Sequence, residues 1–351
     1  MSKKVFVGLS GGVDSSVTAA LLKQQGYDVT GVYMKNWSKR IGQFDCPWEE
    51  DYRDAKKVAV HLGIPFEMYD FEDQYFDKVV QYMLDSFKAG ITPNPDVMCN
   101  QEIKFKLFLD TCLENGADYI ATGHYAKTKH GKLLRAVDEN KDQTYFLYRT
   151  TAEALSKTLF PLGEYTKPQV RKLALDFDLP TATRKESMGI CFVGKVGIKD
   201  FLKEYVHVMK PGNIINQHGA VVGQHEGAIF YTIGQRQGLG VGGGLPFYIT
   251  GKDMQKNEVY VTSDIADPML WNDTIVIGSA HCIDDTRTLD SYKEKLYVRT
   301  RHRAPLVEVK SIKAVGESYE ILLDEQLKAL TPGQSAVLYT DTECVGGGII
   351  S

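Results

Sequence analysis

Near its N-terminus the chain carries the stretch VFVGLSGGVDSS, residues 5–16, and this stretch decides the fold. An apolar, β-branched run meets two glycines, and the apolar-periodic segment 17–22 follows. This order predicts a buried strand, a tight turn and the first turn of a helix. Gly11 and Gly12 let a ligand approach the main chain closely, and the N–H groups at a helix start attract an anion. We therefore predict a phosphate-binding loop.

The loop differs from two common nucleotide-binding motifs. A Walker A loop needs a lysine, and none lies between Gly8 and Leu22, while the pattern G-x-G-x-x-G of dinucleotide-binding loops is absent here. A glycine turn that merely joins a strand to a helix is the plain structural alternative. The polar residues around the glycine pair favour phosphate binding over that alternative, and they are Ser10, Asp14, Ser15 and Ser16.

The composition is that of an ordinary globular protein, with 43% hydrophobic and 25% charged residues in a chain of 351. This length predicts two or three domains. No apolar run approaches the roughly 20 residues of a membrane span, and the first four residues lead directly into a predicted strand. We therefore expect a cytoplasmic protein with neither a membrane segment nor a signal peptide. The net charge of -4 argues only mildly against a nucleic-acid partner.

Strand and helix patterns alternate over the first third of the chain. Such alternation predicts βαβ units and a parallel sheet, with ligands bound beyond the carboxyl ends of the strands. The loop after Leu9, the segment at Met34 and the Gly123-His124 corner fall at that edge. Toward the C-terminus, short strands separated by turns predict a small β-barrel. We expect an α/β catalytic domain over 1–200, a small mixed central domain over 201–271 and a C-terminal β-barrel over 272–351.

The second informative stretch is NPDVMCN, residues 94–100. Prolines on both sides of Asn94 predict a rigid extended loop rather than a helix, with a helix starting at Glu102. Cys99 near that helix start would have its thiolate favoured by the helix dipole. Asp96 is a candidate general acid or base. On the residues alone, a structural turn with an incidental buried cysteine is the favoured interpretation.

Cys191 lies in the stretch RKESMGICFVG, residues 184–194, between glycines and after two basic residues. A mobile, electropositive setting of this kind is typical of a reactive thiol. Two thiols on separate loops suit sulfur transfer, in which one carries a persulfide and the other attacks the sulfur–sulfur bond. Cys112 instead follows the apolar spacing of a helix face and is predicted to be core. The six cysteines contain no C-x-x-C pair, so a zinc ribbon is not expected.

Arg299, Arg301 and Arg303 alternate along a predicted strand. Alternate residues of a strand share a face, so the three guanidinium groups would form a ridge that meets successive phosphates. A solvated strand face balanced by nearby acidic residues is an equally good interpretation from the residues alone.

The segment SGGVDS, residues 10–15, resembles the loop of the PP-loop ATP pyrophosphatases, which split ATP between its α- and β-phosphates. Further motifs resemble the tRNA-specific 2-thiouridylases of that superfamily, in the same order and over essentially the whole chain. They are Asn94-Pro95-Asp96 with Cys99, Thr122-Gly123-His124-Tyr125, Lys141-Asp142-Gln143, Ser187-x-x-x-Cys191, Tyr231-Thr232-Ile233-Gly234-Gln235-Arg236 and Thr331-Pro332-Gly333-Gln334-Ser335.

The resemblance implies a role for each matching position. ATP would be held by Gly8, Leu9, Ser10, Gly11, Gly12, Val13, Asp14, Ser15, Met34 and Gly123. The target uridine would be surrounded by Asn94, Pro95 and Asp96. Asp96 would act as acid or base, Cys99 as nucleophile and Cys191 as persulfide carrier, and the two thiols would close to a disulfide after each turnover. Contacts to tRNA would come from His124, Lys141, Asp142, Gln143, Arg301, His302 and Gln334.

The implied reaction adenylates the C2 oxygen of the wobble uridine in a tRNA anticodon loop and then replaces that oxygen with sulfur from the persulfide. Such a uridine must be splayed out of its stack, which is usual for RNA bases that are read or modified. The products are 2-thiouridine, AMP and pyrophosphate. ATP is the co-substrate, Mg²⁺ is expected beside the departing pyrophosphate, and Asp14 is a candidate to help place it. The sulfur donor would be a cysteine desulfurase or a sulfur-relay protein.

Two other functions fit some of the same residues. A small-molecule ligase of the same superfamily, such as an argininosuccinate or NAD synthetase, would not need two loop cysteines or a terminal barrel. A non-catalytic tRNA-binding or sulfur-carrier protein would leave the intact phosphate loop unexplained.

Overall fold

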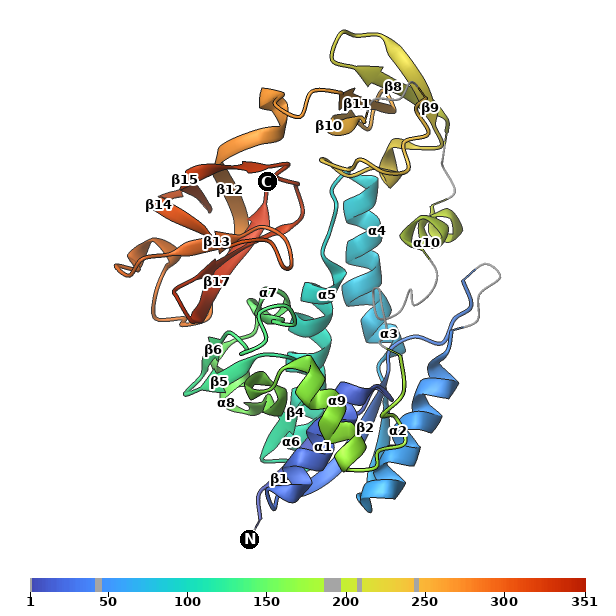
Figure 1. Cartoon of the computed structure of the whole chain (residues 1–351), viewed down its shortest axis with the longest axis vertical. Helices are drawn as coiled ribbons and strands as arrows, with labels where there is room; N and C mark the ends of the chain where they lie inside the picture. Colours follow the sequence, from blue (N-terminus) through green and yellow to red (C-terminus); the bar gives the residue numbers. More distant parts are fainter. Residues whose placement is uncertain (1, 42–45, 186–196, 207–209, 243–245) are drawn as a thin grey trace.

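The computed structural model describes residues 2–41, 46–185, 197–206, 210–242 and 246–351. Three bodies follow one another along the chain: an N-terminal α/β unit, a small central sheet and a C-terminal barrel (Figure 1). The predicted fold class is thereby confirmed. Among the described residues, no helix is long and apolar enough to cross a membrane.

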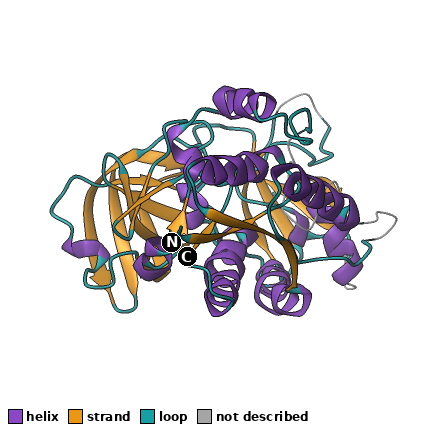
Figure 2. Ribbon diagram, turned by 90° about the horizontal axis from the view of Figure 1, so that it is seen from below, coloured by secondary structure: helices purple, strands orange, loops and turns teal. Residues whose placement is uncertain are grey.

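A parallel sheet of five strands forms the centre of the N-terminal unit, in the order β3-β2-β1-β4-β7. Its strands are β1 (Lys4–Gly8), β2 (Asp28–Lys35), β3 (Phe66–Asp70), β4 (Tyr119–Ala121) and β7 (Thr158–Leu159). Val5 and Val7 of β1 pack into one hydrophobic cluster and Phe6 into another, because helices cover both faces of the sheet (Figure 2). β1 and β4 are hydrogen-bonded neighbours, so the loops at their carboxyl ends meet.

The helices of this unit divide between the two faces of the sheet. α1 (Val13–Gln24) and α2 (Trp48–Leu62) share one face, where Ala55, Val58 and Ala59 of α2 pack against β1. The other face packs against α3 (Glu72–Tyr75), η1 (Phe76–Val80), α4 (Gln81–Lys88), α5 (Pro95–Met98), η2 (Cys99–Leu107) and α6 (Phe108–Glu114). Shorter elements follow at α7 (Thr144–Leu147), α8 (Ala152–Ser156), η3 (Pro161–Glu164), α9 (Lys167–Asp176) and α10 (Ile198–Tyr205).

The central sheet has the order β10-β11-β8-β9, with a parallel pair between β8 and β11. Its strands are β8 (Gly212–Asn216), β9 (Val221–His225), β10 (Tyr248–Asp253) and β11 (Glu258–Thr262), and the 3-10 turn η4 (Ala228–Phe230) packs on them. The core of this sheet is small, and Ile214, Ile249 and Val259 are its fully buried members.

Six antiparallel strands close into the C-terminal barrel, in the order β12-β15-β14-β13-β16-β17 with a final pairing of β17 to β12. They are β12 (Trp271–Cys282), β13 (Tyr297–Arg299), β14 (Val307–Val315), β15 (Ser318–Lys328), β16 (Ser335–Tyr339) and β17 (Glu343–Ile350). The 3-10 turns η5 (Pro268–Leu270) and η6 (Leu289–Ser291) lie before and after β12. Aliphatic side chains such as Ile275, Val298 and Ile321 fill the interior.

A hairpin of the N-terminal unit extends the barrel sheet. β5 (Lys127–Lys129) and β6 (Lys132–Leu134) pair with each other, and β6 pairs with β17 through the register Leu133–Cys344. The Tyr145 hydroxyl adds two hydrogen bonds of 3.1 Å across the same junction, to the carbonyls of Thr300 and Ser335. Main-chain pairing therefore fixes the barrel to the N-terminal unit, an arrangement that the sequence did not predict.

A buried ion pair lies at this junction. Asp142 and Arg299 are 1% and 6% exposed, and Arg299 Nη1 lies 3.8 Å from Asp142 Oδ1. Asp142 also accepts hydrogen bonds from Thr144 Oγ1 at 2.5 Å and from the Ala136 N–H at 2.7 Å. Burial raises the pKa of the Asp142 carboxyl, while the hydrogen bonds and Arg299 act in the opposite direction.

The predicted ridge of three arginines is wrong. β13 ends at Arg299, whose guanidinium is turned inward, 5.5 Å from the centre of the Tyr339 ring. Arg303 lies in the following turn with a φ of 64°, so the extended backbone that would put alternate side chains on one face does not continue. Arg301 and Arg303 are exposed and Arg299 is not.

Asp142→Ala is expected to lower the free energy of unfolding by about 3 kcal/mol or more, because the Arg299 charge would stay buried without its carboxylate. Asp324→Ala is the matched control, since Asp324 pairs with Lys310 on the barrel surface and exposed pairs contribute about 1 kcal/mol or less. Urea unfolding followed by circular dichroism measures both losses. Equal, small losses would show that the buried pair does not hold the junction together.

Candidate active site

Hydrogen bonds of its own serine hydroxyl groups stabilise the loop between β1 and α1. The Ser10 N–H donates to Ser15 Oγ at 3.2 Å, and the hydroxyls of Ser15 and Ser16 donate to the Gly12 carbonyl at 3.1 and 2.8 Å. Gly12 is the N-cap of α1, and no side chain of the described ranges caps that helix. A helix start without a side-chain cap leaves its first N–H groups available to an anion.

Two glycines of the predicted ATP site allow close packing against this loop. A Cβ on Gly123 would lie 2.7 Å from the Ser15 nitrogen, so the corner after β4 presses on the main chain of the loop. A Cβ on Gly8 would lie 3.0 Å from the terminal methyl of Met34, so the Met34 side chain packs on the last residue of β1. The structure thus brings together every predicted ATP-binding position. The remaining ones are the loop residues Leu9, Ser10, Gly11, Gly12, Val13 and Asp14.

A lysine from a helix distant in the sequence forms an ion pair with an aspartate of the loop. Lys167 begins α9, and its Nζ lies 2.7 and 2.8 Å from the two carboxylate oxygens of Asp14. The Tyr125 hydroxyl donates to the same carboxylate at 3.0 Å. Sequence reasoning missed Lys167, although Thr166 and Gln169 form a capping box that marks the start of this helix.

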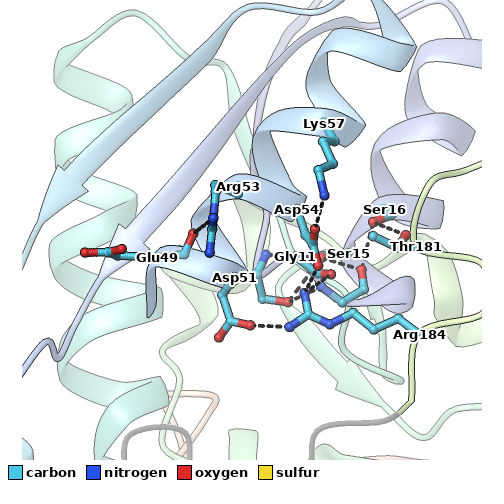
Figure 3. Close-up of polar contacts among 12 residues, drawn as sticks. Gly11, Ser15, Ser16, Glu49, Asp51, Arg53, Asp54, Lys57, Thr181 and Arg184 are labelled. Carbon is cyan, nitrogen blue, oxygen red and sulfur yellow. Dashed lines mark hydrogen bonds and ion pairs between the residues drawn. The ribbon is translucent and has the colours of Figure 1, made fainter. Parts of the chain in front are cut away.

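An arginine also contacts the loop from outside. Arg184 Nη1 donates to the Gly11 carbonyl at 2.7 Å and to Asp54 Oδ2 at 2.9 Å, and Nη2 donates to Asp51 (Figure 3). Burial raises the pKa of the Asp51 carboxyl, and Arg184 opposes that rise. Arg184 was expected only as part of an electropositive stretch, and no spacing signal in the sequence links it to Gly11.

The segment 94–100 is helical, so the prediction of an extended loop is wrong. α5, η2 and α6 form one uninterrupted helix from Pro95 to Glu114. Asn94 is its N-cap and Pro95 its first residue, a position where the missing N–H has no helical partner to lose. Cys99 therefore lies beyond the first turn, where the helix dipole contributes little to a thiolate.

Asp96 lies in the first turn of this helix and is half-buried. Burial raises the pKa of its carboxyl, and the nearby Lys104 opposes that rise. A carboxyl with a raised pKa suits proton transfer better than an ordinary aspartate does. Cys99 follows one turn later and is 1% exposed.

Ring contacts connect this helix to the phosphate loop. The Phe105 ring lies 5.7 Å from the His124 ring, and His124 follows the glycine that presses on Ser15. His124 is 9% exposed, and Thr122 Oγ1 lies 2.7 Å from its Nδ1. Burial lowers the pKa of His124, so the ring is neutral. The helix carrying Asp96 and Cys99 is thus packed directly behind the β4 corner of the loop.

Two residues predicted to contact tRNA are too buried to do so with their side chains. His124 is enclosed by the rings of Phe105 and Phe160, and Asp142 is engaged with Arg299 at the barrel junction. These predictions are corrected: both residues support the site from inside. The motifs that contain them had suggested exposed polar groups, but each side chain has its hydrogen-bond partners within the protein.

Gln334 and Arg301, two of the other residues predicted to contact tRNA, lie where the three bodies meet. Gln334 Nε2 donates to the carbonyls of Thr92 and Pro93 at 2.9 and 3.1 Å, which joins the barrel to the start of the Asp96 helix. Asn94 is 9% exposed, and its side chain is hydrogen-bonded to Tyr145. A cavity of about 300 Å³ opens there, lined by Thr232, Ile233, Gly234, Gln235, Arg301, Thr331 and Gln334.

Arg301 and His302 sit on the turn after β13. Arg301 is exposed, and its Nη2 donates to the Ala329 carbonyl at 2.8 Å. His302 packs on the Phe146 ring at 4.7 Å, and burial together with neighbouring cations lowers its pKa to about 4. Lys141 and Gln143 are half-buried on the segment before α7, where Gln143 Oε1 accepts the Tyr125 N–H at 2.9 Å.

Cys191 lies outside the described residues, so its predicted role rests on the sequence. Within the described part of the chain, no group of three or more His, Cys, Asp or Glu residues is arranged to hold a metal ion.

Comparison with known families covers nearly the whole chain. Residues 3–195 match the family described as "tRNA methyl transferase HUP domain", and residues 199–263 match "tRNA methyl transferase PRC-barrel domain". Residues 270–350 match "Aminomethyltransferase beta-barrel domain".

Curated relatives are similar over almost their full length. The tRNA-specific 2-thiouridylase MnmA of Bacillus subtilis (strain 168) is 48% identical, over 99% of this chain and 94% of that protein. The proteins of the same name from Bacillus pumilus (strain SAFR-032) and Bacillus cytotoxicus are 48% and 47% identical, with the same shares covered.

Proposed function

Because the chain belongs to the tRNA-specific 2-thiouridylase family, as its motifs predicted, we propose that it converts the wobble uridine of tRNA to 2-thiouridine with ATP. One observation carries this proposal. The helix that bears Asp96 and Cys99 packs against the β4 corner, and that corner presses on the phosphate loop. The helix that carries the proposed proton acceptor and thiol is thereby held against the proposed nucleotide loop.

The family descriptions mention methyl transfer, whereas the curated relatives are named for thiolation. The chemistry of the site favours thiolation. An uncapped helix start after a glycine pair suits the phosphates of ATP. Methyl transfer would use neither those phosphates nor a second cysteine.

The first step activates the uridine. Its C2 carbonyl is a poor electrophile with an oxide as leaving group, so the oxygen attacks the α-phosphorus of ATP and pyrophosphate departs. The N–H groups at the start of α1 hold the pyrophosphate, and Lys167 balances charge at Asp14. Asp96 accepts the N3 proton that the uridine loses as its oxygen becomes the nucleophile.

Mg²⁺ is proposed only as the counter-ion that ATP carries. Asp14 does not fit a separate magnesium site, because both of its carboxylate oxygens already accept hydrogen bonds from Lys167. When bound, the ion would neutralise charge on the phosphates.

The second step transfers sulfur. The terminal sulfur of a Cys191 persulfide attacks C2, and AMP leaves with the former uridine oxygen. The Cys99 thiolate then attacks the Cys191 sulfur, which breaks the sulfur–sulfur bond and leaves the outer sulfur on C2. The products are 2-thiouridine and a Cys99–Cys191 disulfide. That disulfide must be reduced before a cysteine desulfurase or a sulfur-relay protein supplies the next persulfide.

The anticodon loop of tRNA contacts the exposed rim of the site. Arg301 offers its guanidinium beside the cavity at the junction of the three bodies, and Lys141 adds a second cation on the α7 side. Further polar side chains at this rim come from His302, Gln143 and Gln334. Asn94 and Pro95 shape the pocket for the flipped uridine. The compartment that holds tRNA and a reducing thiol pool, the cytoplasm, is the proposed location.

The domain division of 1–200, 201–271 and 272–351 is proposed as a functional one, supported by family matches over 3–195, 199–263 and 270–350. The hairpin β5–β6 is the exception, since it belongs to the first domain and pairs with the barrel.

Release of pyrophosphate from ATP tests the proposed function. We expect release only when a tRNA with an unmodified wobble uridine is added, and none with free amino acids or with nicotinic acid adenine dinucleotide. Release that depends on a small acceptor would point to a ligase. No release with any acceptor would favour a non-catalytic carrier.

A further inference from the structure

The turn 181–184 braces the phosphate loop from outside. Thr181 Oγ1 donates to Ser16 Oγ at 2.9 Å, and Arg184 Nη1 donates to the Gly11 carbonyl at 2.7 Å (Figure 3). Arg171 in turn donates to the Arg184 carbonyl at 2.7 Å, so the backbone that carries the guanidinium is itself fixed by α9. Two side chains of one turn therefore contact the loop: Thr181 bonds to the first turn of α1, and Arg184 bonds to the glycine pair.

Position 11 has no side chain that could fix the orientation of the peptide group after it. Its φ is 75°, and a Cβ there would lie 2.5 Å from the Asp51 carbonyl oxygen, so no side chain is possible. The C=O of Gly11 and the N–H of Gly12 belong to one planar trans peptide and point in opposite directions. Arg184 holds the Gly11 carbonyl on the outer side, and the Gly12 N–H points back toward the loop, where it donates to Ser10 Oγ at 3.4 Å.

The charge of Arg184 is already balanced on its outer side. Asp51 and Asp54 from α2 both accept its N–H groups, and all three side chains are at most 31% exposed. A guanidinium that donates to two carboxylates and a carbonyl is held in one orientation by all three acceptors. Its role at the loop is therefore geometric, whereas the backbone amides are the groups that would bind an anion.

We propose that Arg184 is a positioning residue that holds the Gly11–Gly12 peptide in the orientation required for binding the phosphates of ATP. The proposal rests on the proposed function, because it assumes that the loop binds those phosphates. Asp51 and Asp54 keep the guanidinium in place, and Lys57, which pairs with Asp54 at 2.9 Å, completes the charge balance of the group.

Binding of the non-hydrolysable analogue α,β-methylene-ATP tests this role. Arg184→Met should raise the Kd for the analogue about tenfold or more, since a charge-assisted hydrogen bond and the peptide orientation are lost together. Arg184→Lys should give an intermediate Kd, because the ammonium is a compact point charge that does not reproduce the planar fork of the guanidinium. Arg53→Met is the matched control: Arg53 is exposed on α2 and bonds only to the Glu49 carbonyl among the residues drawn in Figure 3, so its Kd should stay within about twofold.

A triple variant, Arg184→Met with Asp51→Asn and Asp54→Asn, separates geometry from charge. If loss of Arg184 acted only by exposing two carboxylates to the phosphates, the triple variant would regain wild-type affinity, and that result would overturn the proposal. We expect it to stay weak. Wild-type affinity of the Arg184→Met variant would overturn the proposal as well.

Affinity for tRNA, measured on the same samples, shows whether each variant is folded, and it should not change. If the methionine variant does not fold, the lysine variant decides: weaker analogue binding supports the role and wild-type binding contradicts it. Failure of the proposed function is recognised separately, because the wild-type protein itself would then bind no analogue or form no 2-thiouridine.

Discussion

Cys99→Ser will abolish formation of 2-thiouridine while tRNA-dependent release of pyrophosphate continues. Adenylation needs the phosphate loop and the carboxylate of Asp96, and neither involves a thiol. The sulfur–sulfur bond can be broken only by a nucleophile such as the Cys99 thiolate, and a serine hydroxyl at neutral pH does not replace it. The separation of the two activities is the expected signature, and one pyrophosphate should appear for each tRNA that stays attached to Cys191 through the unbroken sulfur–sulfur bond.

Cys282→Ser serves as the control for this substitution. Cys282 is half-buried in the barrel beside the Tyr292 hydroxyl at 3.5 Å and has no place in the proposed chemistry. Both activities should survive that change. Cys191→Ser should reproduce the Cys99 result, since the persulfide carrier is lost instead of the attacking thiol. Normal thiolation by either of the two variants would refute the assignment of that cysteine.

Asp96→Asn is expected to slow both pyrophosphate release and thiolation by about 10²- to 10⁴-fold, the usual contribution of a general acid or base. The asparagine keeps the size of the side chain and removes its ability to accept the N3 proton. Asp85→Asn is a suitable control, because Asp85 is exposed on α4, where it accepts from Gln81 Nε2 at 2.8 Å and lies 3.9 Å from Lys88 Nζ. A loss of less than about threefold in the Asp96 variant would exclude a proton-transfer role.

The pH dependence of adenylation gives an independent check on Asp96. Burial raises the pKa of this carboxyl above its ordinary value, which is about 3.9. The base form is the one that accepts a proton, so the rate should rise as pH increases through the raised pKa and fall below it. The acid limb should therefore lie at higher pH than an ordinary aspartate would give, and it should vanish in the asparagine variant.

Local patterns were sufficient to predict the strand, turn and helix start at residues 5–16 and the order of the three folded units. The strand–glycine–helix sequence at residues 5–16 specifies its own conformation, and alternating strands and helices require a parallel sheet. The prediction of an extended loop for residues 94–100 failed because its prolines were interpreted as helix breakers. Asn at the N-cap followed by Pro at the first helical position is instead a good helix start, and that signal was present in the sequence.

Long-range contacts explain what the sequence could not reveal. Lys167 and Arg184 reach the loop from more than 150 residues away, and nothing in their local spacing names Asp14 or Gly11 as partners. The alternation of arginines ended at Arg299 because a buried carboxylate from another domain draws that side chain inward. The Asp142–Arg299 pair depends on how the barrel docks on the N-terminal unit, to which the β6–β17 pairing contributes, whereas the contacts of Lys167 and Arg184 depend on the fold of the N-terminal unit itself.

The most direct measurement is mass spectrometry of the nucleosides of an unmodified tRNA after incubation with the protein, ATP, Mg²⁺ and a persulfide-generating cysteine desulfurase. We expect 2-thiouridine, located by nuclease mapping at the wobble position, and none when ATP is omitted. Unchanged uridine in the complete reaction, or a methylated nucleoside in its place, would contradict the proposed function.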